Sequence, residues 1–110
     1  MIKMAIASAI YLVGMQAGIT APRAAFVECL KQASKQAQSD KIAGETYADY
    51  ARGRCTSQAQ SLKSALVSFD VKNGIARKQA SSDADLQIDD YLQTSLGHYQ
   101  MLATPASAPK

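Results

Sequence analysis

The chain has little of the chemistry that most enzymes and metal proteins use. Its 110 residues include no tryptophan, one histidine, two cysteines and two phenylalanines. It is too short for a multidomain enzyme, a barrel or a doubly wound sheet, all of which need far more chain. Its net charge of +3 is too small to indicate a nucleic-acid-binding protein by itself. We therefore expect one small domain, with no enzymatic activity, no cofactor and no nucleic-acid partner.

Proline is absent from the 82 residues between Pro22 and Pro105. Alanine, serine and glutamine supply 20, 11 and 10 residues, and no long stretch alternates apolar and polar residues as a strand would. Alanine and glutamine favour helix, which an internal proline would interrupt. The sequence predicts an all-α fold over residues 18–103, a small three-helix bundle built on a disulfide-linked helical hairpin and preceded by a signal helix.

Residues 1–17 have the pattern of a secretory signal peptide. Lys3 is the only charge before Arg23, and twelve apolar or small residues follow it from Met4 to Met15. This run is shorter than the roughly twenty residues of a membrane-spanning helix. We expect cleavage after Ala17 and a periplasmic or secreted protein. The alternatives are retention as a membrane anchor and a buried N-terminal helix of a cytosolic domain.

Apolar residues recur at helical spacing in the first two predicted helices. The first helix is expected to begin near Pro22 and to end at a turn over residues 39–44, of which Gly44 is the most flexible. Its apolar face is Phe26, Cys29, Leu30, Ala33 and Ala37, and its polar side includes Lys31, Lys35 and Gln38. The second helix is expected from Glu45 or Thr46 to the stop signal Asn73-Gly74. Its apolar face is Ala51, Cys55, Ala59, Leu62, Leu66 and Phe69.

A third helix is expected from Ala76 or Ser81 to Leu102, unless it continues the second helix through a kink. Its inner face is Ala84, Ile88, Tyr91, Leu92, Ser95, Tyr99 and Leu102. The tyrosines are expected to lie at the edge of a small alanine-rich core; they are Tyr47, Tyr50, Tyr91 and Tyr99. Residues 104–110 are expected to form a disordered tail.

The two cysteines lie on the apolar faces of the first two predicted helices, with Ile42 midway between them, 13 residues from each. Residues equidistant from the turn of an antiparallel helical hairpin lie at the same height, so Cys29 and Cys55 are expected to face each other. An exported protein normally pairs its cysteines, and we predict a Cys29–Cys55 disulfide. Two buried free thiols are the alternative. The spacing is not that of a redox motif, and only His98 could join the thiols as a zinc ligand.

Neither the histidine nor the charged clusters form a recognisable catalytic or metal motif. His98 is expected near the end of the last helix, where it complements the helix dipole or faces water. An acidic cluster lacks the glycine and glutamate of a calcium loop and indicates a solvated face; it comprises Asp83, Asp85, Asp89 and Asp90. A basic cluster lacks a phosphate-binding loop and is expected to pair with these aspartates or to meet an anionic surface; it comprises Lys72, Arg77 and Lys78. We predict no metal site.

A further pattern is made by Glu28-Cys29-Leu30-Lys31, by Tyr50 with Cys55, by Phe69-Asp70-Val71-Lys72-Asn73-Gly74 and by Asp89-Asp90-Tyr91. It resembles a group of small exported bacterial helical proteins that have no assigned reaction. The resemblance covers about residues 26–99. It implies a periplasmic helical protein with one disulfide, and it implies no catalytic or binding residue.

The sequence favours a small exported helical protein that binds another protein or a surface of the cell envelope. One alternative is an envelope stress chaperone, which would expose apolar surface on acidification or on dimer dissociation. A second alternative is an enzyme inhibitor or immunity-type protein, which would have one tight partner. Contact with a membrane is expected only through the signal segment, if it is not cleaved.

Overall fold

The computed structural model describes residues 2–103, and describes side chains from Gly18 to Leu102. This part of the chain forms four helices and no strand: α1 (Ile2–Ser39), α2 (Gly44–Arg54), α3 (Thr56–Lys72) and α4 (Arg77–Ala103). The predicted all-α class is confirmed. The predicted tail over residues 104–110 lies outside the described residues.

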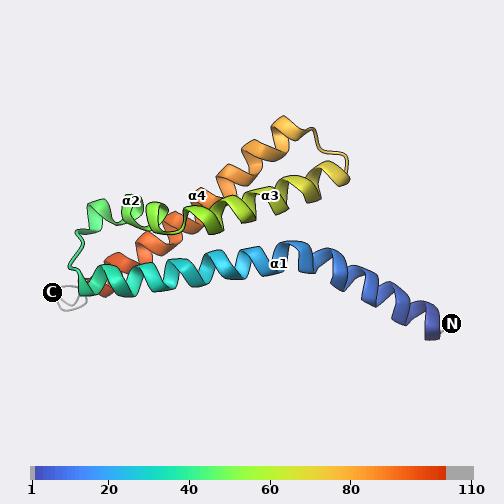
Figure 1. Ribbon diagram of the computed structural model, residues 1–110, viewed down its shortest axis with the longest axis horizontal. Coiled ribbons are helices and arrows are strands. Elements are labelled where there is room, and N and C mark those ends of the chain that lie inside the picture. The colour runs from blue at the N-terminus through green and yellow to red at the C-terminus, as the bar shows by residue number, and fades with distance from the viewer. Residues whose placement is uncertain (1, 104–110) are drawn as a thin grey trace.

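The helices form two antiparallel rows and one crossing element (Figure 1). α1 runs along one side of the molecule, and α2 and α3 follow each other back along the other side. α4 then crosses behind them and runs in the same direction as α1. α1 packs chiefly against α3, whereas α4 packs against both α3 and α2. α1 and α4 are therefore parallel neighbours although they lie at opposite ends of the sequence.

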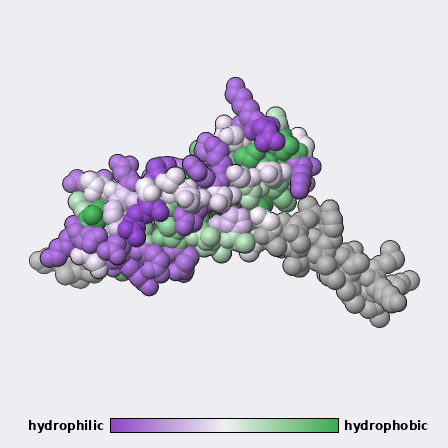
Figure 2. Space-filling view, viewed as in Figure 1, coloured by the Kyte–Doolittle hydropathy of each residue, from purple (hydrophilic) through white to green (hydrophobic). Residues whose placement is uncertain are grey.

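Most of the core residues lie on the apolar faces that the helical spacing predicts, but Tyr47, Val67 and Ala80 are buried outside those faces, and the predicted Phe69 is only partly buried. The buried residues are Phe26, Leu30, Ala33, Ala37, Tyr47, Ala51, Cys55, Leu62, Leu66, Val67, Ala80, Ala84, Ile88, Leu92 and Tyr99. Leu102, predicted to face inwards, is 53% exposed because it lies at the end of α4. Tyr47 and Tyr99 lie in the centre of the core and not at its edge. Figure 2 shows polar residues over most of the face it presents, with apolar residues gathered at the end where α3 meets α4.

The predicted second helix is divided at Cys55 into α2 and α3, so the described residues form four helices, where a bundle of three preceded by a separate signal helix was expected. The hydroxyl of Thr56 donates to the carbonyls of Arg52, at 2.9 Å, and Gly53, at 3.2 Å. Such back-bonding from a threonine bends a helix, and a glycine in the last turn weakens it further. The break is local, because Cys55 still donates to the Ala51 carbonyl at 3.0 Å.

α1 begins twenty residues earlier than the helix predicted from Pro22, and Pro22 lies inside it. A proline within a helix removes one backbone hydrogen bond and bends the axis. The ribbon of α1 bends ahead of the part that packs against α3 (Figure 1). The predicted signal segment, residues 1–17, overlaps the first half of this helix, where the side chains are not described. Among the described residues, no helix combines the length and the hydropathy needed to cross a membrane.

The predicted stop at Asn73-Gly74 separates α3 from α4, so these are not one kinked helix. Gly74 has a φ of 92°, in the left-handed region that glycine adopts without strain. The amide of Ile75 donates to the Asp70 carbonyl at 2.9 Å, and the amide of Gly74 donates to the Val71 carbonyl at 3.1 Å. These two bonds are the Schellman arrangement, which satisfies the last carbonyls of a helix.

The turn between α1 and α2 ends α1 in the same way, but with a lysine in the left-handed position. Lys41 has a φ of 56°, whereas the most flexible residue was expected to be Gly44. The amide of Ile42 donates to the Ala37 carbonyl at 2.9 Å, and the amide of Lys41 donates to the Gln38 carbonyl at 3.2 Å. A side chain at such a position is strained, because its Cβ approaches the following carbonyl. Lys41 is therefore the one strained backbone position that the turn requires.

Candidate functional site

The cysteine pair fixes α1 to the corner between α2 and α3. The Cα atoms of Cys29 and Cys55 lie 5.9 Å apart, and their sulfur atoms are at disulfide-bonding distance. This places the two residues opposite each other, as their equal distance from Ile42 predicts. Cys55 is fully buried and Cys29 is partly buried. The link holds α1 in place over the segment that forms one wall of a groove between α1 and α4.

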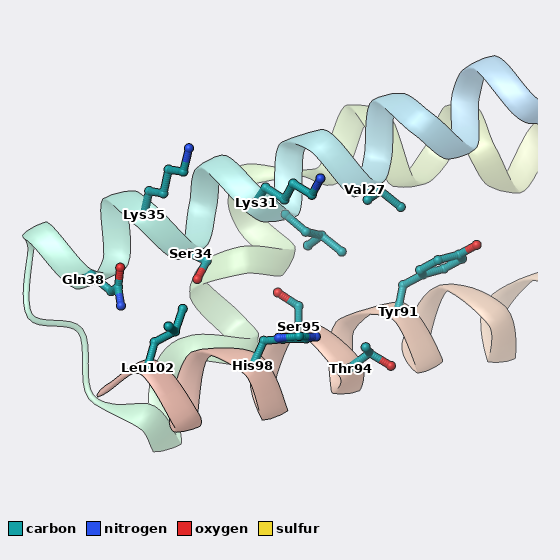
Figure 3. Close-up of a pocket in the computed structure, with 11 residues that line it drawn as sticks. Val27, Lys31, Ser34, Lys35, Gln38, Tyr91, Thr94, Ser95, His98 and Leu102 are labelled. Atoms are coloured by element: carbon teal, nitrogen blue, oxygen red, sulfur yellow. The ribbon is translucent and has the colours of Figure 1, made fainter. Parts of the chain in front are cut away.

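A groove of about 520 Å³ lies between α1 and α4. The residues that line it are Val27, Leu30, Lys31, Ser34, Lys35, Gln38, Tyr91, Thr94, Ser95, His98 and Leu102 (Figure 3). Each wall extends over three helical turns, about 16 Å at 1.5 Å per residue. Sites for small ligands have volumes of about 300–1,000 Å³, so this groove has the size of a binding site.

The two walls, α1 and α4, run in the same direction, so the earlier residues of both walls lie at one end of the groove and the later residues of both lie at the other (Figure 3). Val27 and Tyr91 lie at one end, and Gln38 and Leu102 lie at the other. The serines and His98 lie between these ends. Leu30, which is 5% exposed, belongs both to the core and to the lining. The groove therefore has an apolar floor that is continuous with the hydrophobic core.

The charged side chains that line the groove are two lysines, and a histidine lies opposite them in the lining. Lys31 and Lys35 stand on α1 and His98 stands on α4; in Figure 3 the Lys35 side chain points away from α4, and the Lys31 side chain runs along α1. All three are exposed. No aspartate or glutamate lines the groove. An apolar floor with a cationic edge matches an apolar molecule that carries a negative charge.

A tyrosine of α2 supports the groove from behind. The hydroxyl oxygen of Tyr47 lies 2.7 Å from Oγ of Ser95 and 3.5 Å from the carbonyl oxygen of Leu30. These are residues of the two opposite walls. Tyr47 is fully buried, so its ring is packed on all sides. The spacing between α1 and α4 is thus fixed from α2, and the groove exists without a ligand.

A second buried tyrosine joins the ends of α1 and α4. The hydroxyl of Tyr99 donates to the carbonyls of Ala37, at 3.2 Å, and Ile42. Burial raises the pKa of Tyr99, and repulsion from the neighbouring tyrosines Tyr47 and Tyr50 raises this pKa further. The group stays a neutral hydrogen-bond donor at ordinary pH, and it fixes the groove at the Gln38–Leu102 end.

The predicted acidic cluster lies outside the groove and has partners other than those expected. Asp85 pairs with Lys63 at 2.9 Å, and Asp89 pairs with Arg52 at 3.5 Å. Arg52, Asp85 and Asp89 are exposed, and Lys63 is partly buried. The pairing expected with the basic cluster is therefore wrong for these two aspartates, because α3 and α2 present other basic residues to α4. Among the described side chains, no three His, Cys, Asp or Glu residues gather closely enough to hold a metal ion.

Sequence reasoning placed the lysines correctly on the outer side of the first helix, but it did not find the groove. Lys31 and Lys35 are exposed, as expected. They border the groove because α4 packs beside that side of α1. A pattern within one helix does not predict which other helix packs beside it. The available signal was Val27, an apolar residue off the predicted core face and one turn before Lys31.

No protein-family model, curated protein or solved structure matches this chain. The resemblance to small exported bacterial proteins stays a prediction. The interpretation of the groove rests on its own residues.

Proposed function

We propose that this chain is an exported, non-enzymatic binding protein of the cell envelope and that the groove between α1 and α4 is its binding site. The observation that supports binding is the groove itself, with an apolar floor and a basic edge. Its floor belongs to the core, and its walls are held apart by Tyr47. A preformed concave site of this kind loses little conformational entropy when it binds.

Two features support a periplasmic or secreted location. Residues 1–17 carry the basic start and apolar run of a signal peptide. Cys29 and Cys55 lie at disulfide-bonding distance. Disulfides persist in oxidising compartments and are rare in the reducing cytosol. Both features favour export of the chain.

The composition of the groove supports binding rather than catalysis. His98 and two serines line it, but no carboxylate does. A serine–histidine pair needs a third group that orients the histidine. Moreover, the hydroxyl of Ser95 is already bonded to Tyr47. The groove therefore lacks the arrangement that would activate a nucleophile.

Site-specific photocrosslinking in living cells tests this function. A photoreactive amino acid replaces Thr94, an exposed residue of the groove, and in a control chain it replaces Gln87, an exposed residue of α4 outside the groove. We expect an adduct at position 94 in the envelope fraction and much less at position 87. Equal labelling at both positions, or no adduct at position 94, contradicts the proposal.

A second function, that of an envelope stress chaperone, is supported by apolar side chains on the surface of α4. Leu86, Met101 and Leu102 are 69%, 73% and 53% exposed. Exposed apolar residues of this kind contact unfolded clients. The test is light scattering of a heat-aggregating client protein, with and without this chain, at neutral and acidic pH. Unchanged scattering at every pH removes this function.

A further inference from the structure

We infer that the groove binds the hydrocarbon chain of a free fatty acid, with the carboxylate held at the edge formed by Lys31, Lys35 and His98. This inference rests on the proposed binding function and names its ligand class. Three observations carry it: the length of the apolar floor, the sign of the charge around it, and the small number of residues that form the site.

The floor of the groove fits one extended apolar chain. Val27 and Tyr91 at one end and Leu102 at the other supply apolar surface along three helical turns, about 16 Å. The ring of Tyr91 is fixed by an edge contact with Phe26, with centroids 5.9 Å apart. Burial of apolar surface is roughly proportional to area, so affinity is expected to rise about two- to fourfold with each methylene in this half-open groove.

The charges around the groove select the head group. Lys31 and Lys35 are positive at neutral pH, and no acidic side chain among the lining residues opposes them. A single carboxylate at this edge gains two favourable charge interactions, whereas a cationic head group meets repulsion. The expected ligand is thus an anionic amphiphile and not a neutral or cationic one.

The size of the site favours a small ligand over a protein partner. Eleven residues line the groove. A standard protein–protein interface uses about 20–30 residues on each side. The groove is too small to hold a folded partner by itself, but its volume of about 520 Å³ is that of a small-molecule site.

Calorimetric titration of the purified, oxidised chain tests the inference with four probes, each below its micelle-forming concentration. The probes are dodecanoate, octanoate, butyrate and dodecyltrimethylammonium. We expect dodecanoate to bind one to one, octanoate to bind at least about 16-fold more weakly, and butyrate to bind at least about 250-fold more weakly, as two- to fourfold per methylene requires. The cationic amphiphile is expected to bind at least about tenfold more weakly than dodecanoate. Equal affinity for dodecanoate and dodecyltrimethylammonium overturns the assigned role of the lysines.

Three variants locate the binding. Lys31→Gln with Lys35→Gln is expected to weaken dodecanoate binding about five- to twentyfold at low salt. Lys72→Gln with Lys78→Gln removes the same charge away from the groove and is expected to leave the affinity unchanged. Thr94→Trp fills the groove from an exposed position and is expected to abolish binding without loss of helicity. Full binding by the Thr94→Trp variant overturns the inference.

A vesicle assay separates a free fatty acid from a membrane lipid. Co-sedimentation with phosphatidylglycerol vesicles, without calorimetric binding of dodecanoate, assigns the edge to lipid head groups and overturns the inference. The photocrosslink distinguishes the two proposals. A peptide adduct at position 94 keeps the binding function and overturns the fatty-acid ligand, whereas no adduct there overturns the binding function itself.

Discussion

The rings of Tyr47 and Tyr99 are stacked, with their centroids 4.2 Å apart and their planes inclined by 9°. Tyr47 belongs to α2 and Tyr99 to α4, and each hydroxyl reaches a backbone carbonyl of α1. The pair therefore joins three helices that the chain order separates. It also lies behind the groove, because Tyr47 contacts the groove residue Ser95.

Removing the Tyr99 hydroxyl tests this connection. Tyr99→Phe keeps the ring and the stack, but it leaves the carbonyls of Ala37 and Ile42 without this donor. We expect a loss of about 1–3 kcal/mol in the free energy of unfolding, measured by urea denaturation. Tyr91→Phe serves as the matched control and is expected to change the stability by less than about 0.5 kcal/mol. Equal losses in the two variants contradict a special role for Tyr99.

The raised pKa of Tyr99 predicts how stability depends on alkaline pH. Burial holds the folded-state pKa above the value of about 10 for an unfolded tyrosine. Below that pH, Tyr99 is protonated in both states and its contribution is complete. As the pH rises further, the unfolded chain loses the proton first, so stability falls until the folded pKa is passed. Unfolding free energies measured across this range should fall less steeply for Tyr99→Phe, and parallel curves contradict the assignment.

At the two Schellman turns, introducing a glycine and removing one are expected to have opposite effects on stability. Lys41→Gly relieves a left-handed lysine, and we expect a gain of up to about 1 kcal/mol in stability, partly offset by the greater freedom of glycine in the unfolded chain. Gly74→Ala places a Cβ in the same kind of position and should cost about 1–2 kcal/mol. Thermal unfolding of both variants checks this. Destabilisation by Lys41→Gly contradicts the strain assigned to that turn.

Breaking the cysteine link tests how much it stabilises the fold. Cys29 and Cys55 are 26 positions apart, and a closed loop of this size corresponds to about 3.6 kcal/mol in the chain-entropy estimate. We expect the reduced protein and the Cys29→Ser variant to lose about 3–4 kcal/mol in urea denaturation. Cys29→Ser is the better variant, because Cys55 is fully buried and serine there adds the cost of a buried hydroxyl. Equal stability of the oxidised and reduced chains contradicts this role.

Much of the fold follows from local pattern. The buried face of α1 is that of its apolar spacing, and Asn73-Gly74 ends α3 as its chemistry predicts. The break at Cys55 could not be predicted, because it depends on a hydrogen bond from the Thr56 hydroxyl. A threonine at this position is equally compatible with an uninterrupted helix. The central position of Tyr47 was also not predicted. Alanine-rich helix faces leave space in the core for a large side chain, and the location of that space is set only when the helices pack together.

The candidate site was less predictable than the fold. The pairing of Cys29 with Cys55 follows from their equal distance along the sequence from Ile42, in the turn between α1 and α2. The groove, in contrast, is lined by Lys31 from α1 and His98 from α4, two helices that become parallel neighbours only after α2 and α3 have reversed the chain twice. No spacing within either helix encodes that direction. The sequence therefore predicts which residues are polar and apolar, but not which polar residues share a groove.

The proposed function requires export of the chain and closure of the Cys29–Cys55 link, which holds one wall of the groove. Intact mass of the protein recovered from the cell envelope, alkylated before and after reduction, measures both. We predict a chain beginning at Gly18 whose cysteines accept alkylation only after reduction. Recovery of the uncut chain from the cytosol, with both thiols alkylated before reduction, contradicts both export and the disulfide.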